Sequence, residues 1–216
     1  MFYGSWPAKS AIMTAMQTRL LGHPEERDRR RLQLTAPHAA PLADWVSGLR
    51  TPERWVPDLD PADGGQAARA LLLLESPGPA ASVSGFVSVD NPGGTSENLL
   101  CLLHLAGLRR RDLAVWNAVP WQMSAGGVVA PRPAQYAEAA PLTRELLALL
   151  PGLRVVVLVG RHAAAAWPQV GSALPTLACP HPSPQNFRAR PETALRALEV
   201  LGEVRRRLRG APETEG

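Results

Sequence analysis

The sequence predicts an α/β fold of three layers, in which helices cover both faces of a central, mostly parallel four-stranded sheet. Three short runs of apolar residues predict buried strands, namely Ala70–Leu74, Leu113–Asn117 and Val155–Val159. Strands that are apolar along their whole length are typical of parallel sheets that are buried on both faces. Segments with helical periodicity separate these runs, as expected for an α/β protein.

The remaining elements follow from spacing and from residues that start or stop helices. Leu42, Trp45, Val46 and Leu49 recur at helical spacing and predict the first short helix of the domain. Further helices are expected over residues 95–107, 134–150, 161–167 and 191–208, the last beginning near a proline that suits a first helical turn. A weaker fourth strand is expected over Leu174–Cys179.

Length and composition indicate one folded domain. The chain has 216 residues, of which 45% are hydrophobic and 19% charged, and no apolar run approaches the ~18 residues of a membrane span. The formal net charge is +4, and Lys9 is the only lysine, so arginine carries nearly all of the positive charge. This surplus is compatible with a polyanionic partner, although a biased base composition explains it equally well.

We expect residues 1–35 to form a peripheral N-terminal extension, residues 36–209 a single α/β domain and residues 210–216 a frayed tail. The extension contains the charge run Glu25–Arg31, which is typical of a solvated helix or tail. It has no apolar core long enough for a signal peptide, so we expect a cytoplasmic protein, monomeric and without membrane attachment.

The two cysteines, Cys101 and Cys179, are too few for a disulfide framework or a four-cysteine metal site. Cys179 and His181 form a single Cys-x-His pair without a second pair, so no metal site is expected.

Polar or structurally restricted segments follow all four predicted strands. In chain order they are Glu75-Ser76-Pro77-Gly78, the segment that begins at Asn117, Gly160-Arg161-His162 and His181-Pro182-Ser183-Pro184. The carboxyl ends of parallel strands meet at one edge of a sheet, where open α/β sheets bind their ligands. We therefore expect an acid, an amide and an imidazole to converge at this edge.

These segments together resemble the uracil-DNA glycosylase superfamily. His181-Pro182-Ser183-Pro184 stands where that family has its His-Pro-Ser-Pro loop, and Glu75-Ser76-Pro77-Gly78 is similar to its water-activating loop, especially in the iron–sulfur thermostable class. Asn117 matches the base-reading asparagine of the family, and Phe86 lies near the position of its base-stacking aromatic residue. The order and spacing agree over roughly Ala70 to Pro191.

The resemblance implies a DNA repair enzyme that extrudes a nucleotide and hydrolyses the bond between the base and the sugar. Glu75, with Ser76 beside it, would orient the attacking water, and His181 would stabilise negative charge on the departing base. Asn117 would pair with the Watson–Crick edge of uracil or a related deaminated base, and Phe86 would stack on its ring. Further residues would contact DNA: Gly78, Gly94 and Ser183 at phosphates, Gln185 at the position of a wedge residue, and Arg161, Arg188 and Arg190 along the groove.

The sequence departs from the family pattern in four places, one of which is Gln185 at the position where some classes have an apolar wedge residue. Leu74 replaces the usual glycine that opens the water loop, and Ser76 stands where several classes have a catalytic Asp or Asn. The four cysteines of the iron–sulfur class are absent, so no cofactor is expected. Because Lys9 lies far from the proposed site in the sequence, we expect a monofunctional glycosylase without a Schiff-base step.

Other interpretations remain open. The Ser76 and Leu74 substitutions favour a non-catalytic binder of damaged or single-stranded DNA with the same fold. Taken singly, Glu75 could form a salt bridge or cap a helix, Asn117 could cap a turn, and Phe86 could belong to the core. An unrelated α/β hydrolase or nucleotide-binding enzyme is disfavoured, because the sequence has no Gly-x-Ser-x-Gly elbow, P-loop or dinucleotide fingerprint.

Overall fold

The computed structural model describes residues 18–123 and 129–210, and its centre is a sheet of four parallel strands in the order β4-β2-β5-β6. The strands are β2 (Ala70–Leu74), β4 (Leu113–Asn117), β5 (Val155–Val159) and β6 (Thr176–Cys179). Three of them have the predicted bounds, and β6 is two residues shorter than expected. A second, parallel pair joins β1 (Asp58–Leu59) to β3 (Phe86–Val87).

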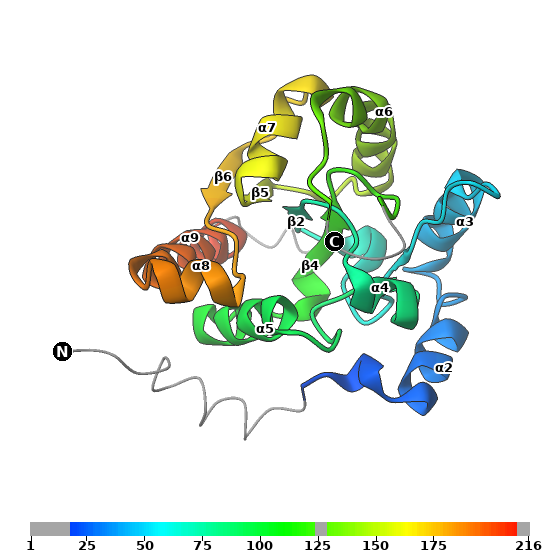
Figure 1. Ribbon diagram of the computed structural model, residues 1–216, viewed down its shortest axis with the longest axis horizontal. Helices are drawn as coiled ribbons and strands as arrows, with labels where there is room; N and C mark the ends of the chain where they lie inside the picture. The colour runs from blue at the N-terminus through cyan, green and yellow to red at the C-terminus, as the bar shows by residue number, and fades with distance from the viewer. Residues whose placement is uncertain (1–17, 124–128, 211–216) are drawn as a thin grey trace.

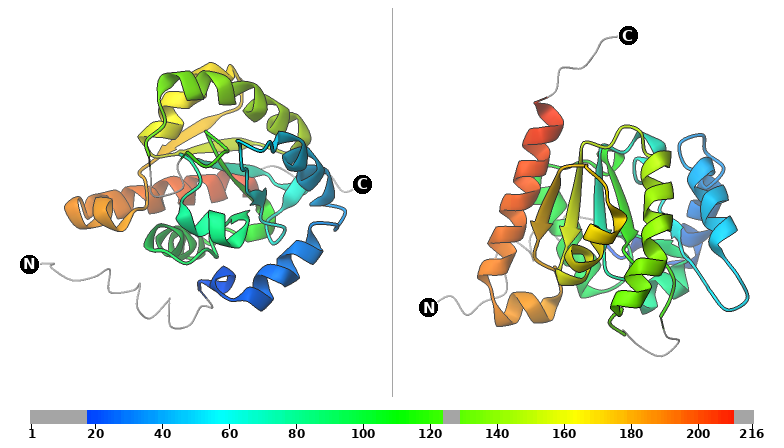
Figure 2. Two further views of the ribbon diagram at one scale, coloured as in Figure 1. Left: turned by 45° about the vertical axis from the view of Figure 1, so that its right-hand side comes forward. Right: turned by 90° about the horizontal axis from the view of Figure 1, so that it is seen from above.

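Helices form the two outer layers. Among the described residues the helices are α2 (Pro24–Gln33), α3 (Ala40–Leu49), α4 (Pro79–Ser84), α5 (Gly94–Ala106), α6 (Pro133–Leu149), α7 (Arg161–Val170), α8 (Pro184–Ala189) and α9 (Glu192–Arg209). Helices α5 and α9 pack together on one face of the sheet, and α6 packs with α7 on the other (Figures 1 and 2). The predicted three-layer α/β/α architecture is therefore confirmed.

The core forms where the apolar strands lie side by side. Leu72 of β2 is opposite Val115 of β4 and Val157 of β5, and the side chains of Leu72 and Val157 are fully buried. Because both faces of these strands are covered by helices, every position along them favours an aliphatic residue. This is why the continuous apolar runs predicted the strands residue by residue.

The order of the strands determines where a ligand can bind. The chain runs from β2 outward to β4, and then crosses back to β5 on the other side of β2. The connections after β2 and β5 therefore leave the sheet in opposite directions, which opens a crevice at the carboxyl ends of these strands. In the part of the chain that is described, no helix is long and apolar enough to cross a membrane.

The charge run in the N-terminal region is not simply solvated, contrary to the prediction. It forms α2, and Arg30 in this helix is only 2% exposed. Arg30 pairs with the buried Asp60 and, at 2.8 Å, with Asp90. A charge pattern alone does not distinguish an exposed arginine from one that meets buried carboxylates brought together by the fold.

Arg110 is the second cation of this buried cluster. It pairs with Asp60 at 2.8 Å, with Asp63 at 2.7 Å and with Asp90. Three acids thus face two arginines, and burial raises the pKa of Asp63 to about 7 even though Arg110 is adjacent. The cluster fixes α2 and the loop after β3 against the body of the domain.

Candidate functional site

The carboxyl ends of the strands meet at one edge, as the sequence predicted. Leu74 at the end of β2 is in register with Asn117 at the end of β4. Beyond them, the main-chain N–H of Val119 donates a 3.0 Å hydrogen bond to the carbonyl of Glu75. Glu75 and Asn117 are therefore held close together by pairing between strands.

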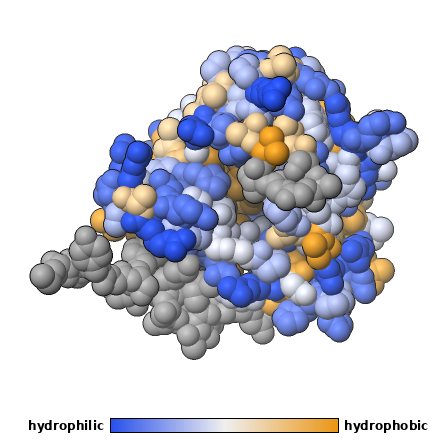
Figure 3. All heavy atoms as spheres, in the orientation of Figure 1, coloured by the Kyte–Doolittle hydropathy of each residue, from blue (hydrophilic) through white to orange (hydrophobic). Residues whose placement is uncertain are grey.

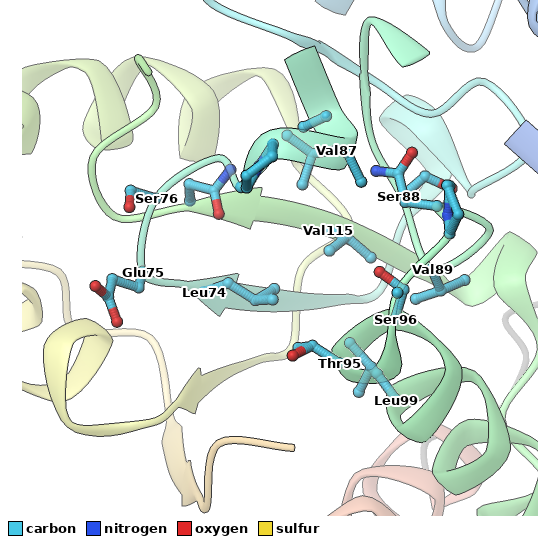
Figure 4. A pocket seen from close by; sticks show the side chains of 18 of the residues that line it. Leu74, Glu75, Ser76, Val87, Ser88, Val89, Thr95, Ser96, Leu99 and Val115 are labelled. Atoms are coloured by element: carbon cyan, nitrogen blue, oxygen red, sulfur yellow. The ribbon is translucent and has the colours of Figure 1, made fainter. Parts of the chain in front are cut away.

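A cavity of about 400 Å³ opens at this edge, beside the ends of β2 and β4 (Figures 3 and 4). Aliphatic side chains form its inner wall, and polar residues lie around it. Figure 4 shows the carboxylate of Glu75 beyond the end of β2, pointing away from Val115 and Leu99 in the apolar part. The volume is in the range of small-molecule sites. Of the predicted site residues, the lining contains Glu75, Ser76, Gly78, Gly94, Asn117 and His181.

Asn117 lies in the wall of this cavity with its side-chain nitrogen unpaired. The residue is only 2% exposed, and its Nδ2 has no hydrogen-bond partner among the described residues. A buried donor without a partner costs about 1–3 kcal/mol, which makes the Asn117 amide a candidate for donating a hydrogen bond to a ligand in this cavity.

His181 reaches the same cavity from the loop after β6. Gly160 makes room for it: a Cβ at that position would lie 3.0 Å from the Cβ of His181, and Gly160 has φ +87°. Burial lowers the pKa of the His181 imidazole, and the neighbouring His162 lowers it further. At neutral pH the ring is therefore uncharged and carries one N–H donor.

Glu75 has a partner that was not among the predicted site residues. His162 Nε2 lies 3.7 Å from Glu75 Oε2, and the hydroxyl of Tyr136 is 2.6 Å from His162 Nδ1. Arg161 Nε donates to His162 Nε2 at 3.1 Å. The position of His162, three residues after the end of β5, is the signal that could have identified it, because this places it at the crevice between β2 and β5.

The structure does not bring Phe86 to the cavity, contrary to the prediction. Phe86 is 1% exposed and packs in the core, whereas the next residue, Val87, lines the cavity. Successive side chains of a strand point to opposite sides, so only one of this pair can face a ligand. No Phe, Tyr or Trp is present in the described lining of the cavity, and its apolar wall is aliphatic.

The His-Pro-Ser-Pro segment is held mainly by contacts within the protein. The hydroxyl of Ser183 accepts a 3.2 Å hydrogen bond from the main-chain N–H of Asn186 and caps α8, and Ser183 is not in the cavity lining. Asn98 Nδ2 donates to the carbonyl of Pro182 at 2.8 Å. A Cβ at Gly94 would lie 2.3 Å from Pro184 Cγ, so glycine allows α5 to approach this loop.

The other predicted DNA-contacting residues are exposed and lie outside the cavity lining. Arg188 Nε donates to the carbonyl of Pro184 at 3.3 Å, and Arg161 contacts His162 as described. Both arginines therefore flank the segments that carry His181 and His162. The remaining two residues in this group are Gln185 and Arg190.

The described residues contain no group of three His, Cys, Asp or Glu side chains placed to hold a metal ion. Cys179 is buried at the end of β6, and burial raises the pKa of its thiol to about 12. The chemistry available at the cavity is therefore that of a carboxylate, a neutral imidazole, amides and hydroxyls. Fold and cavity together define a parallel α/β protein with its candidate site at the carboxyl edge of the sheet.

Comparison with known proteins agrees with this description. The sequence profile of the uracil DNA glycosylase superfamily matches residues 61–202, and the chain belongs to this superfamily. It is also similar to the solution NMR structure of a candidate uracil DNA glycosylase from Methanosarcina acetivorans, with 18% sequence identity and a TM-score of 0.42 over 64% of this chain and 92% of that one. No curated protein matches the sequence. Membership of the superfamily supports a DNA glycosylase-like function with DNA as substrate.

Proposed function

We propose that this protein hydrolyses the N-glycosidic bond of uracil, or of a related deaminated base, in DNA. The observation that carries the proposal is the buried, unpaired Nδ2 of Asn117 in a cavity that Glu75 and His181 also line. A base inside a duplex cannot reach such a cavity, so the nucleotide must be flipped out of the stack.

Recognition of the base would combine the aliphatic wall with the Asn117 amide. Val87, Val115 and Leu99 provide an apolar surface for a flat ring. The Asn117 Nδ2 donates to a carbonyl oxygen of the base, which all deaminated bases possess. A ligand carbonyl would satisfy the donor that the protein leaves unpaired.

His181 would act on the departing base. Cleavage leaves negative charge on the uracil ring, chiefly at O2, and a donor at that oxygen stabilises the charge as it develops. The neutral imidazole of His181 provides an N–H for this purpose without requiring a second protonation. Its position, fixed by Gly160 and the loop after β6, allows it to donate without reorganising.

Glu75 would act on the sugar side of the bond. The sugar becomes cation-like as the base departs, so a nearby carboxylate stabilises it and orients the attacking water. Figure 4 shows the Glu75 carboxylate beyond the end of β2 and away from the apolar wall. This position supports a role for Glu75 at the sugar, while the apolar wall receives the base. Because Lys9 is the only lysine in the sequence, we expect hydrolysis without cleavage of the DNA backbone.

The direct test is base release from an oligonucleotide that contains one deoxyuridine, followed by alkali to cut at the abasic site. We expect alkali-dependent cleavage and free uracil, with single- and double-stranded substrates compared. If neither uracil nor another deaminated base is released from either form, the proposal is wrong. Salt-sensitive DNA binding without release would instead support the non-catalytic DNA binder.

Variants of Glu75 and His181 test the roles proposed for these two residues. Glu75→Gln and His181→Asn should each lower the single-turnover rate by about 10²–10⁴-fold and leave DNA affinity nearly unchanged. Arg31→Ala is a suitable control, since Arg31 is exposed on α2 and pairs with Asp28. Equal losses of rate and affinity in the two site variants would indicate structural roles for Glu75 and His181.

A further inference from the structure

A second asparagine in the cavity wall has an unpaired polar atom of the opposite kind. Asn91 is 5% exposed and lines the same cavity as Asn117. Its Oδ1 has no hydrogen-bond partner among the described residues, whereas at Asn117 the unpaired atom is Nδ2. The cavity wall therefore contains one buried acceptor and one buried donor, each without a partner in the protein.

The orientation of the Asn91 amide is fixed by the backbone. Its Nδ2 donates a 2.8 Å hydrogen bond to the carbonyl of Phe86, so the group that remains for a ligand is Oδ1. Rotating the amide by half a turn would place two oxygens against each other and lose this bond. The main chain is restricted as well, because Asn91 precedes Pro92 and its N–H donates to the carbonyl of Ser88 at 3.4 Å.

A hydrogen-bond acceptor with a fixed orientation at this place favours ligands that present a hydrogen-bond donor to it. An amide oxygen attracts N–H and O–H groups and repels phosphate oxygens, so Asn91 does not suit a DNA phosphate. The deoxyribose within a DNA strand has no free hydroxyl group to offer. The aliphatic residues Val87 and Val89 beside it favour the flat ring of a base. The matching group is therefore an N–H on the base itself.

Deaminated bases have the required pattern. Each has a carbonyl next to a ring N–H, such as O4 and N3–H of uracil or O6 and N1–H of hypoxanthine. Cytosine and adenine have a ring nitrogen that only accepts at the corresponding position, whereas thymine and guanine share the carbonyl and ring N–H of the deaminated bases. A freely rotating asparagine pairs with either pattern, but Asn91 cannot adapt without losing its bond to Phe86.

We propose that Asn91 is a specificity-determining residue whose Oδ1 accepts the ring N–H of a deaminated base, while Asn117 Nδ2 donates to the adjacent carbonyl. This inference rests on the proposed glycosylase function and extends it by assigning the group that rejects cytosine and adenine. Asn91 acts by contact with the substrate base and takes no part in the transfer of protons.

The test compares two oligonucleotides, one with deoxyuridine and one with N3-methyl-deoxyuridine, which lacks the ring N–H. The wild type should prefer the deoxyuridine substrate by about tenfold or more in kcat/KM and in affinity. Asn91→Ala removes the acceptor and leaves room for the methyl group, so its preference should fall to near unity. Asn91→Asp, whose protonated carboxyl can donate to Phe86 and still accept from the base, should keep the preference at acidic pH.

Asn98→Ala is the matched control. Asn98 is also buried and also donates to a main-chain carbonyl at 2.8 Å, that of Pro182, but it is not in the cavity lining. Its replacement should slow both substrates equally and preserve the preference. If Asn91→Ala behaves in the same way, Asn91 only supports the backbone and the inference is overturned.

Failure of the proposed function would be seen separately. In that case the wild type releases no base from either oligonucleotide. The dissociation constants of the two DNAs with the wild type and with each variant still show whether Asn91 contacts the ring N–H of the base. A wild type that binds both DNAs equally would refute the role of Asn91, whatever the outcome for catalysis.

Discussion

His162 Nε2 lies 3.7 Å from Glu75 Oε2, so a carboxylate at the end of β2 is adjacent to an imidazole from the first turn of α7. These two segments leave the sheet on opposite sides of the crevice between β2 and β5. Tyr136 contacts the other ring nitrogen of His162 at 2.6 Å and thereby fixes the plane of the ring. The carboxylate proposed to orient water thus lies within ion-pair distance of His162, and the two form a pair when that ring is protonated.

Replacing His162 by Phe should lower kcat by about tenfold with little change in KM, because the ring volume is kept while the polar contact with Glu75 is lost. Single-turnover base release measures this effect. Tyr136→Phe, which removes only the hydroxyl next to His162, should produce a smaller change in the same direction. A rise in KM with unchanged kcat would show that His162 contacts the substrate instead of positioning Glu75.

His181 should titrate below its ordinary pKa of about 6.5 in the folded protein, because burial and the neighbouring His162 both disfavour the charged ring. The unfolded chain then binds a proton before the folded one. The unfolding free energy should therefore decrease as the pH falls from about 6.5 to the folded-state pKa of His181, and this component should disappear in His181→Asn. Nitrogen NMR of the imidazole measures the pKa directly. It should rise in His162→Phe, and an unchanged value would exclude His162 as a cause.

Phe86 and Val87 should behave differently when truncated, because adjacent strand residues face opposite sides. Phe86→Ala should cost about 3–5 kcal/mol of unfolding free energy, as expected for a large core residue. Val87→Ala should cost less stability but lower kcat/KM by about tenfold, because it removes apolar surface from the cavity wall. Denaturant unfolding and base release distinguish the two. A variant of Phe86 that folds normally but no longer binds the base would restore the stacking role predicted from the sequence.

Arg30 and Arg31 are neighbours in α2 with very different environments. Arg30→Ala should destabilise the protein by about 3–5 kcal/mol, since it leaves the buried Asp60 and Asp90 with a single arginine, Arg110. Arg31→Ala should change stability by less than about 1 kcal/mol, because its pair with Asp28 is exposed. Equal effects in thermal unfolding would mean that the buried cluster contributes no more than a surface pair.

The sequence was sufficient for three of the four strands of the central sheet and for several of the residues that line the cavity. Buried parallel strands require continuous apolar runs, so β2, β4 and β5 were predicted to the residue, and the polar segments at their carboxyl ends identified Glu75, Asn117 and His181. The helices α4 and α8 and the strands β1 and β3 were missed, since elements of two to six residues contain less than two full periods of any pattern.

The errors in the site have specific physical causes. Phe86 was predicted to stack because an aromatic residue is the usual partner of a flipped base in the family, while the side of the strand that a residue faces depends on tertiary pairing. Asn91 was overlooked because Asn-Pro-Gly-Gly is a strong turn signal. Only the structure shows that Asn91 Nδ2 donates to the carbonyl of Phe86 while its buried Oδ1 has no hydrogen-bond partner among the described residues.

The contact between Gly94 and Pro184 limits which side chains this part of the site accepts. A Cβ on Gly94 would lie 2.3 Å from Pro184 Cγ, so no space remains for a side chain between the start of α5 and the loop that carries His181. Around Gly78, by contrast, a Cβ would meet nothing within 4 Å. Gly78→Ala should therefore be tolerated, whereas Gly94→Ala would force the start of α5 and the His-Pro-Ser-Pro loop apart.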